Sequence, residues 1–253
     1  MKSSLKKLFL DYLDRKGLQV VKKYEMPAEA SNYEKKIILK SLKYSMTTSI
    51  RMWALLQSAK EVLKKKIKGD FVECGVWRGG NIILLKNILE QHKIKKNVYG
   101  FDTFQGMTEP TRHDVDTENN SASILMKNTN KNDQEFSIWA YSSLEKTKKN
   151  IYKNIKSKKN LKLIQGKVED TLVIKENVPK KISLLRLDTD WYESTKIELE
   201  ILYPLLQKGG ILIIDDYGHF KGCRKAVDEY FSKHKKRPLL HYVDYTCRLI
   251  IKE

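Results

Sequence analysis

The sequence lacks several features that mark common protein classes. Its three cysteines, Cys74, Cys223 and Cys247, have neither the close pairing of a disulfide framework nor metal-ligand spacing. No apolar run is long enough to span a bilayer. The run at residues 8–10 is too short and too charged for a signal peptide. We therefore expect a cytoplasmic protein with reduced thiols and no transmembrane segment.

The sequence also lacks a concentrated basic stripe, although its net charge is +18. The lysines are scattered along the chain, and no aromatic residues are interleaved with them as in single-strand nucleic-acid sites. Solvated helix faces and loops explain most of this charge, and we expect no specific nucleic acid as a partner. A basic surface that steers an anionic substrate is the alternative. At 41% hydrophobic residues, the chain can bury a sizeable core.

The first 68 residues are predicted to form a helical extension or lid, with a strong helical segment at residues 49–66. Near the start, Leu5, Phe9, Tyr12 and Leu13 share one face of an amphipathic helix. That face is suited to pack on the main domain or on a second copy of the chain, so a homo-oligomer is one expectation. The main domain is predicted to comprise residues 69–253.

From residue 71 onward, strand-like and helix-like segments alternate, which predicts an α/β fold with a doubly wound, mostly parallel sheet. The chain ends in two β-like runs, residues 239–243 and 246–251, that should form an antiparallel hairpin. A terminal antiparallel hairpin on such a sheet is typical of class I methyltransferases. Residues 103–134 are polar, and we interpret them as a mobile loop that covers an active site. The expected segments are strands at 71–74, 98–101, 161–164, 182–187 and 209–214, and helices at 80–92, 142–156, 195–206 and 223–233.

Two acidic clusters follow buried strands. Asp188 comes after the strand at 182–187, and Asp215 and Asp216 come after the strand at 209–214. Ligands of open α/β sheets bind at the carboxyl ends of the strands. Three carboxylates there repel one another unless a cation or proton neutralises them. An all-oxygen set favours Mg²⁺, Mn²⁺ or Ca²⁺ over zinc. The alternative is one helix cap and one salt bridge.

Two further residues beside these clusters have open roles. Asp190 lies three residues before Glu193, so the pair predicts a capping box, with substrate binding as the alternative. His219 follows Gly218 in the loop after the second cluster. Either it is structural, or it points into the mouth of the crevice, where it would orient substrate or transfer a proton.

A glycine-rich turn, residues 75–80, follows the first strand. Val76 fills the position of the second glycine of G-x-G-x-x-G, which disfavours a dinucleotide. Glu73 is expected to place a negative charge near the crevice, which suits a cationic ligand such as a sulfonium. Asp102 ends the second strand, where it would bind a ribose diol or serve as a turn or cap residue. After the third strand, Glu169 and Asp170 are placed to meet an adenine edge, or Asp170 caps a short helix.

The sequence resembles the macrocin O-methyltransferase family, the metal-dependent sugar methylases of macrolide antibiotic pathways. The matching stretches are residues 69–80, 102–107, 184–195 and 209–230, within a similarity that spans residues 44–231. Gln105 stands where an acid is usual, Phe220 stands where tryptophan is expected, and Cys223 replaces a smaller residue. No proposed metal ligand is lost.

The resemblance implies S-adenosylmethionine as methyl donor and Mg²⁺, or alternatively Mn²⁺, held by Asp188, Asp215 and Asp216. It implies methylation of a sugar hydroxyl in a glycan precursor, a nucleotide-linked sugar or a glycosylated natural product, with surface polysaccharide assembly as one context. Asp188 or His219 would help remove the proton. The remaining alternatives are a nucleic-acid methyltransferase and a non-catalytic cofactor-binding or assembly protein. The expected cofactor-binding residues are Met46, Thr47, Glu73, Gly75, Val76, Trp77, Arg78, Gly79, Asp102, Thr103, Phe104, Gly106, Met107, Glu169 and Asp170.

Overall fold

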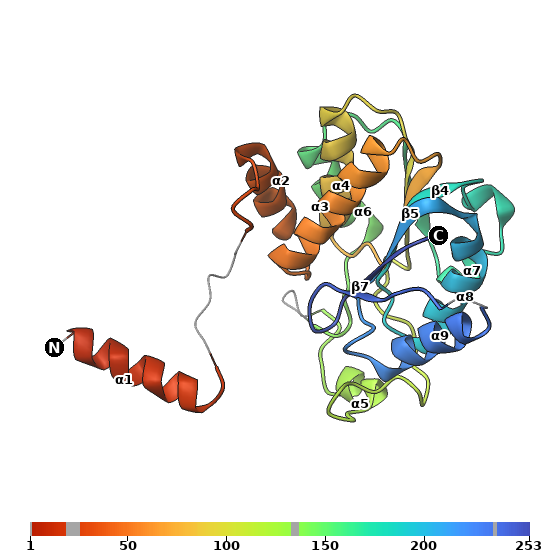
Figure 1. The fold of residues 1–253 in the computed structure, drawn as a ribbon. Coiled ribbons are helices and arrows are strands. Elements are labelled where there is room, and N and C mark those ends of the chain that lie inside the picture. The colour runs from red at the N-terminus through yellow and green to blue at the C-terminus, as the bar shows by residue number, and fades with distance from the viewer. Residues whose placement is uncertain (1, 19–25, 133–136, 235–236) are drawn as a thin grey trace.

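A seven-stranded sheet forms the centre of the molecule, with strand order β3-β2-β1-β4-β5-β7-β6 (Figure 1). The computed structural model describes the whole chain except residues 1, 19–25, 133–136 and 235–236. Strand pairing is parallel from β3 to β5 and antiparallel at β5–β7 and β7–β6. The expected doubly wound sheet with a terminal antiparallel hairpin is confirmed. The strands are β1 (Asp70–Cys74), β2 (Val98–Asp102), β3 (Leu161–Gln165), β4 (Ile182–Leu187), β5 (Leu206–Ile214), β6 (His241–Tyr242) and β7 (Arg248–Ile251).

Helices cover both faces of the sheet, and successive strand residues point to opposite layers. In β1, Phe71 packs with the helices of one face, whereas Val72 and Cys74 pack with those of the other. The first layer contains α2 (Asn32–Leu42), α3 (Ser49–Lys64), α4 (Gly80–Gln91) and α6 (Leu144–Asn154). The second contains α5 (Ala122–Lys127), α7 (Val168–Thr171), α8 (Tyr192–Leu202) and α9 (Lys221–Ser232). Two short 3-10 turns, η1 (Lys175–Asn177) and η2 (Tyr203–Leu205), complete the described elements.

The N-terminal helices α2 and α3 are well specified by their sequence. Ser31 caps α2 in a reciprocal capping box with Glu34, and the Thr48 side chain accepts the Arg51 N–H at the start of α3. Both helices share one hydrophobic core with the sheet and α4. The division of the chain at residue 68 stays a prediction, because the extension and the main domain are packed together on this face.

The first helix, α1 (Lys2–Arg15), stands away from the sheet in Figure 1. Its apolar residues Leu8, Phe9 and Tyr12 are 65%, 57% and 57% exposed. The expectation that this face contacts a second copy stays a prediction. Among the residues described, no helix combines the length and apolar character needed to cross a membrane.

The polar stretch 103–134 is more ordered than the sequence predicts, as far as its described residues show. It contains α5 and an antiparallel bridge between Val115 and Ser121. The buried Asp114 carboxylate organises this stretch, because it accepts the Thr111 N–H at 2.6 Å and the Tyr192 N–H at 2.7 Å. Local side-chain hydrogen bonds thus order much of this stretch. The interpretation that it is mobile and covers an active site stays a prediction.

Candidate active site

A cavity of about 230 Å³ lies at the carboxyl ends of β1, β2, β4 and β5. Parallel strands end at the same sheet edge, so residues far apart in the chain meet there. Of the residues predicted for the site, those that line the cavity are Met46, Thr47, Gly75, Val76, Trp77, Asp102, Thr103, Gly106, Met107, Glu169, Asp188, Asp215 and Asp216. The remaining six, Glu73, Arg78, Gly79, Phe104, Asp170 and His219, are not among the described lining residues.

The glycine turn after β1 depends on close backbone approach. Gly75 has φ +84°, and a Cβ atom there would lie 1.9 Å from the Asp188 carbonyl oxygen. Gly79 has φ +93° at the N-cap of α4, where a Cβ atom would lie 2.4 Å from the Ile151 side chain. Neither position accommodates a side chain without movement of its neighbours. The turn thus brings the end of β1 against the end of β4.

Asp102 holds this turn in place from the end of β2. Its Oδ2 accepts the Val76 and Trp77 N–H groups, both at 2.8 Å, and its Oδ1 accepts the Phe104 N–H at 2.6 Å. Burial raises the pKa of the Asp102 carboxyl, and these backbone donors act against that rise. Asp102 therefore serves as a turn residue, one of its two predicted roles. Binding of a ribose diol stays a prediction.

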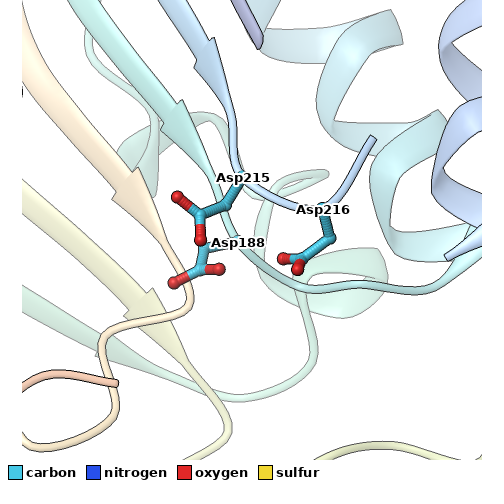
Figure 2. A group of neighbouring side chains, drawn as sticks. All are labelled: Asp188, Asp215 and Asp216. Atoms are coloured by element: carbon cyan, nitrogen blue, oxygen red, sulfur yellow. The ribbon is translucent and has the colours of Figure 1, made fainter. Parts of the chain in front are cut away.

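The three aspartates converge as the strand-end argument predicts (Figure 2). Asp188 follows β4, and Asp215 and Asp216 follow β5, with one carboxylate oxygen from each residue within 4.8 Å of the others. Carboxylate oxygens at adjacent strand ends are the donor set of a hard divalent cation. The residues present therefore fit Mg²⁺ or Mn²⁺.

Two arginines that the sequence argument missed lie within this cluster. Arg186 Nη1 lies 2.7 Å from Asp188 Oδ2, and Arg186 Nη2 lies 2.8 Å from Asp215 Oδ1. Arg51 Nη1 lies 2.6 Å from Asp215 Oδ2. The sequence did contain a signal for Arg186, because it is a charged residue within an otherwise apolar strand. Arg51 had none, because 164 residues separate it from Asp215.

The arginines compensate only part of the negative charge. Burial would raise the pKa of Asp215, but Arg186 and Arg51 outweigh it and lower that pKa. The pKa values of Asp188 and Asp216 are raised well above the usual range, first by burial and then by neighbouring carboxylates. The cluster thus requires protons or a cation, which is the observation that supports a metal here.

Glu73 does not line the cavity itself, but it lies directly behind Asn81, which does. The residue is fully buried, accepts a hydrogen bond from Asn81 Nδ2 at 2.7 Å and pairs with Arg186 Nη1 at 2.9 Å. Because Arg186 also pairs with two aspartates, its charge does not offset the effect of burial, which raises the pKa of Glu73 to about 7. Its position inside β1 points the side chain toward the start of α4, so its charge lies just behind the cavity wall and is paired with Arg186. That this charge favours a cationic ligand stays a prediction.

Asp190 does not have its predicted capping role. Trp191, not Asp190, is the N-cap of α8, and the Trp191 side chain makes no capping hydrogen bond, so the capping box with Glu193 is wrong. Asp190 instead has φ +66° and lines the cavity, where its carboxyl shares a hydrogen bond with Asp216. Burial raises the pKa of Asp190 to about 7, and the charges of Asp188 and Asp215 act in the same direction.

The residues outside the cavity have packing contacts. The His219 ring contacts Phe220 and Tyr245, with centroid distances of 4.5 and 6.2 Å, and its buried Nδ1 has no hydrogen-bond partner among the described residues. Arg78 stacks its guanidinium over the Trp77 ring. Phe104 is buried, and Asp170 lies inside α7, whose N-cap is Lys167, so Asp170 does not cap that helix.

The family model described as macrocin-O-methyltransferase matches residues 1–252. The chain belongs to the macrocin O-methyltransferase family. It is 34% identical over 185 residues to the demethyldecarbamoylnovobiocin O-methyltransferase of Streptomyces niveus, across 72% of this chain and 66% of that protein. It is 32% identical to an 8-demethyl-8-(2,3-dimethoxy-alpha-L-rhamnosyl)-tetracenomycin-C 4'-O-methyltransferase of Streptomyces olivaceus, across 77% and 70% of the two chains.

The structure of the O-methyltransferase NovP superposes on this macrocin O-methyltransferase family member with a TM-score of 0.71 and 27% identity, and covers 97% of this chain and 98% of NovP. The class I methyltransferase fold and the family resemblance are therefore confirmed. Membership of the family makes the chain an O-methyltransferase. The site residues predicted from sequence are placed by the structure, and their roles stay predictions.

Proposed function

We propose that this protein transfers a methyl group from S-adenosylmethionine to a sugar hydroxyl with the help of Mg²⁺ or Mn²⁺. The observation that carries the proposal is one cavity with two chemically different ends. The glycine turn and Asp102 form one end, and the three aspartates form the other. Two relatives carry names of sugar-containing natural products, which supports a sugar-containing acceptor.

The methyl donor would lie against the glycine turn. Trp77 and Met107 give this end of the cavity apolar surface, and Glu169 supplies a carboxylate that faces the cavity. Met46 and Thr47 line the cavity from the segment before α3 and would cover the bound cofactor. With the cofactor bound, these residues would exclude water and orient the donor, and such alignment supplies a large part of the rate.

The cation would be held by Asp188, Asp215 and Asp216. A bound divalent ion lowers the pKa of a coordinated hydroxyl and positions its oxygen. Arg186 and Arg51 pin the Asp215 carboxylate from both oxygens, which restricts its rotation. The ligand oxygens are therefore held in place before the acceptor binds.

Asp190 is the best-placed side chain to accept the proton of the acceptor hydroxyl. It lines the cavity next to Asp216, whereas His219 is not among the described lining residues. Asp190→Asn should lower kcat about 10²–10⁴-fold, the usual contribution of a general base, without a change in cofactor affinity. His219→Gln should lower kcat less than about tenfold, because a residue that is not the general base makes a smaller contribution. The opposite ranking would return the role to His219.

Calorimetric titration tests the bipartite site independently of the acceptor. Wild-type protein should bind S-adenosylmethionine at one site and Mg²⁺ at a second, and Asp215→Asn should lose Mg²⁺ binding while it retains the cofactor. Failure of the wild type to bind S-adenosylmethionine would contradict the proposed function. A cytoplasmic location is part of the proposal and is supported by three buried free thiols. A role in surface polysaccharide assembly likewise stays a proposal.

A further inference from the structure

The loop between β6 and β7, residues 243–247, is fastened to the loop that follows Asp216. The Gly218 N–H donates to the Thr246 carbonyl at 2.7 Å. A Cβ atom at Gly218 would lie 1.8 Å from the Tyr245 carbonyl oxygen, so only glycine permits this approach. The position of Tyr245 is therefore fixed relative to the aspartate cluster.

The same loop is fastened to the rim of the cavity. The Asp244 carboxylate accepts Arg51 Nε at 2.7 Å and the Cys247 N–H at 2.9 Å. Arg51 itself lines the cavity and contacts Asp215. Tyr245 directly follows Asp244, so its side chain extends from a point anchored beside the candidate metal ligands.

Tyr245 is also the exposed end of a row of aromatic rings. Trp191 contacts Phe220 with a centroid distance of 5.0 Å, Phe220 contacts His219 at 4.5 Å, and His219 contacts Tyr245 at 6.2 Å, all edge to face. Trp191 and Phe220 are buried, whereas Tyr245 is 60% exposed. Trp191 is in turn held by a hydrogen bond from its Nε1 to the carbonyl of Thr108, which lines the cavity.

We propose that Tyr245 binds the acceptor by stacking against one face of its sugar ring, an inference that rests on the proposed function. The face of an aromatic ring carries partial negative charge and attracts the weakly positive C–H groups on the apolar face of a pyranose. A ring supported from behind by His219 loses little conformational entropy when the sugar binds. The hydroxyl to be methylated would then extend past the rim toward Asp216.

Tyr242 provides a matched control on the same hairpin. It is 69% exposed, and its ring packs against the Arg248 guanidinium instead of against His219. Both tyrosines are thus accessible to solvent, but only Tyr245 belongs to the aromatic row, whose buried end, Trp191, is hydrogen-bonded to the cavity-lining Thr108. If any exposed tyrosine of this hairpin bound sugar, substitution of either residue would weaken binding. If Tyr245 alone stacks on the sugar, only its substitution would.

The test is saturation-transfer NMR and titration with methyl α-L-rhamnopyranoside, methyl α-D-mannopyranoside and TDP-rhamnose, each in the presence of S-adenosylhomocysteine and Mg²⁺. Tyr245→Ala should weaken the affinity for the bound probe about five- to tenfold, as expected for loss of one aromatic contact. The saturation transferred from the protein to the C–H protons of the sugar ring should fall in parallel. Tyr245→Phe and Tyr242→Ala should stay within about twofold of wild type.

The outcomes distinguish failure of the Tyr245 platform from failure of the proposed function. If a probe binds the wild type and Tyr245→Ala leaves its affinity unchanged, or Tyr242→Ala weakens it equally, the platform is refuted and the proposed function stands. If S-adenosylmethionine binds and none of the sugars does, the sugar acceptor and the platform both fall. Unchanged binding of S-adenosylhomocysteine in every variant shows that the fold is intact.

Discussion

Glu73→Gln should change how the stability of the protein depends on pH. Glu73 is fully buried and shares Arg186 with Asp188 and Asp215, so its charge is incompletely compensated. Its pKa of about 7 in the folded protein exceeds the ordinary value of 4.5. The folded state therefore binds the proton more tightly than the unfolded state. The stability that this proton supplies is fully present below pH 4.5 and is lost as pH rises through 7.

The magnitude follows from the same two values. Integrated from pH 5 to pH 8, a rise from 4.5 to 7 corresponds to a loss of about 2.5 kcal/mol in the free energy of unfolding. Glutamine keeps the size and one acceptor oxygen of glutamate but does not titrate. The wild type should thus lose about 2.5 kcal/mol relative to Glu73→Gln between these pH values.

Urea denaturation at pH 5, 6, 7 and 8, followed by circular dichroism, measures this difference directly. Glu176→Gln, an exposed substitution in η1, is the control and should differ from wild type by less than about 0.5 kcal/mol at each pH. If the difference in stability between wild type and Glu73→Gln were the same at every pH, Glu73 would have equal proton affinity in the folded and unfolded states, and its raised pKa would be wrong.

Four further changes have defined outcomes. Gly75→Ala should lower the free energy of unfolding by more than about 2 kcal/mol in chemical denaturation and weaken S-adenosylmethionine binding, because φ at Gly75 is +84° and a Cβ atom there would clash with the Asp188 carbonyl. A variant with wild-type stability and binding would contradict this close approach. Arg51→Ala should lower the free energy of unfolding by about 1–3 kcal/mol, because Asp215 loses one of its two arginine partners. For the same reason Mg²⁺ should raise the Tm of this variant more than that of wild type. Equal shifts in Tm would contradict the view that the arginines neutralise only part of the charge of the aspartates. Gly218→Ala should reproduce the weaker probe binding of Tyr245→Ala, since its Cβ would displace the 243–247 loop, and unaltered binding would show that the loop position is unimportant. If α1 joins two copies, Phe9→Glu combined with Tyr12→Glu should reduce the mass in light scattering to the monomer value of 29.6 kDa, whereas a wild type already at that mass would exclude the homo-oligomer.

The doubly wound sheet was predictable from the alternation of strand-like and helix-like segments. The meeting of Asp188, Asp215 and Asp216 was predictable because the ends of parallel strands lie at one edge of the sheet. Glu73 lies behind the cavity wall and not in it, because the alternation of side chains along β1 points it toward Asn81 at the start of α4. The spacing of Asp190 and Glu193 left a capping box and substrate binding both open, and the positive φ with which Asp190 lines the cavity cannot be read from sequence. Arg51 reaches the site through contacts between distant segments, and the same kind of contact holds the loop of Tyr245 beside it; local patterns carry no information about such contacts.

The decisive measurement is the transfer of a labelled methyl group from S-adenosylmethionine to TDP-rhamnose and to the methyl glycosides, made before chelation, after chelation and after return of Mg²⁺. We expect a sugar O-methyl product from at least one acceptor, loss of turnover with the chelator, and recovery with Mg²⁺ but not in Asp215→Asn. Turnover that persists after chelation would contradict the metal role of the three aspartates. Cofactor binding without methylation of any sugar would contradict the proposed acceptor.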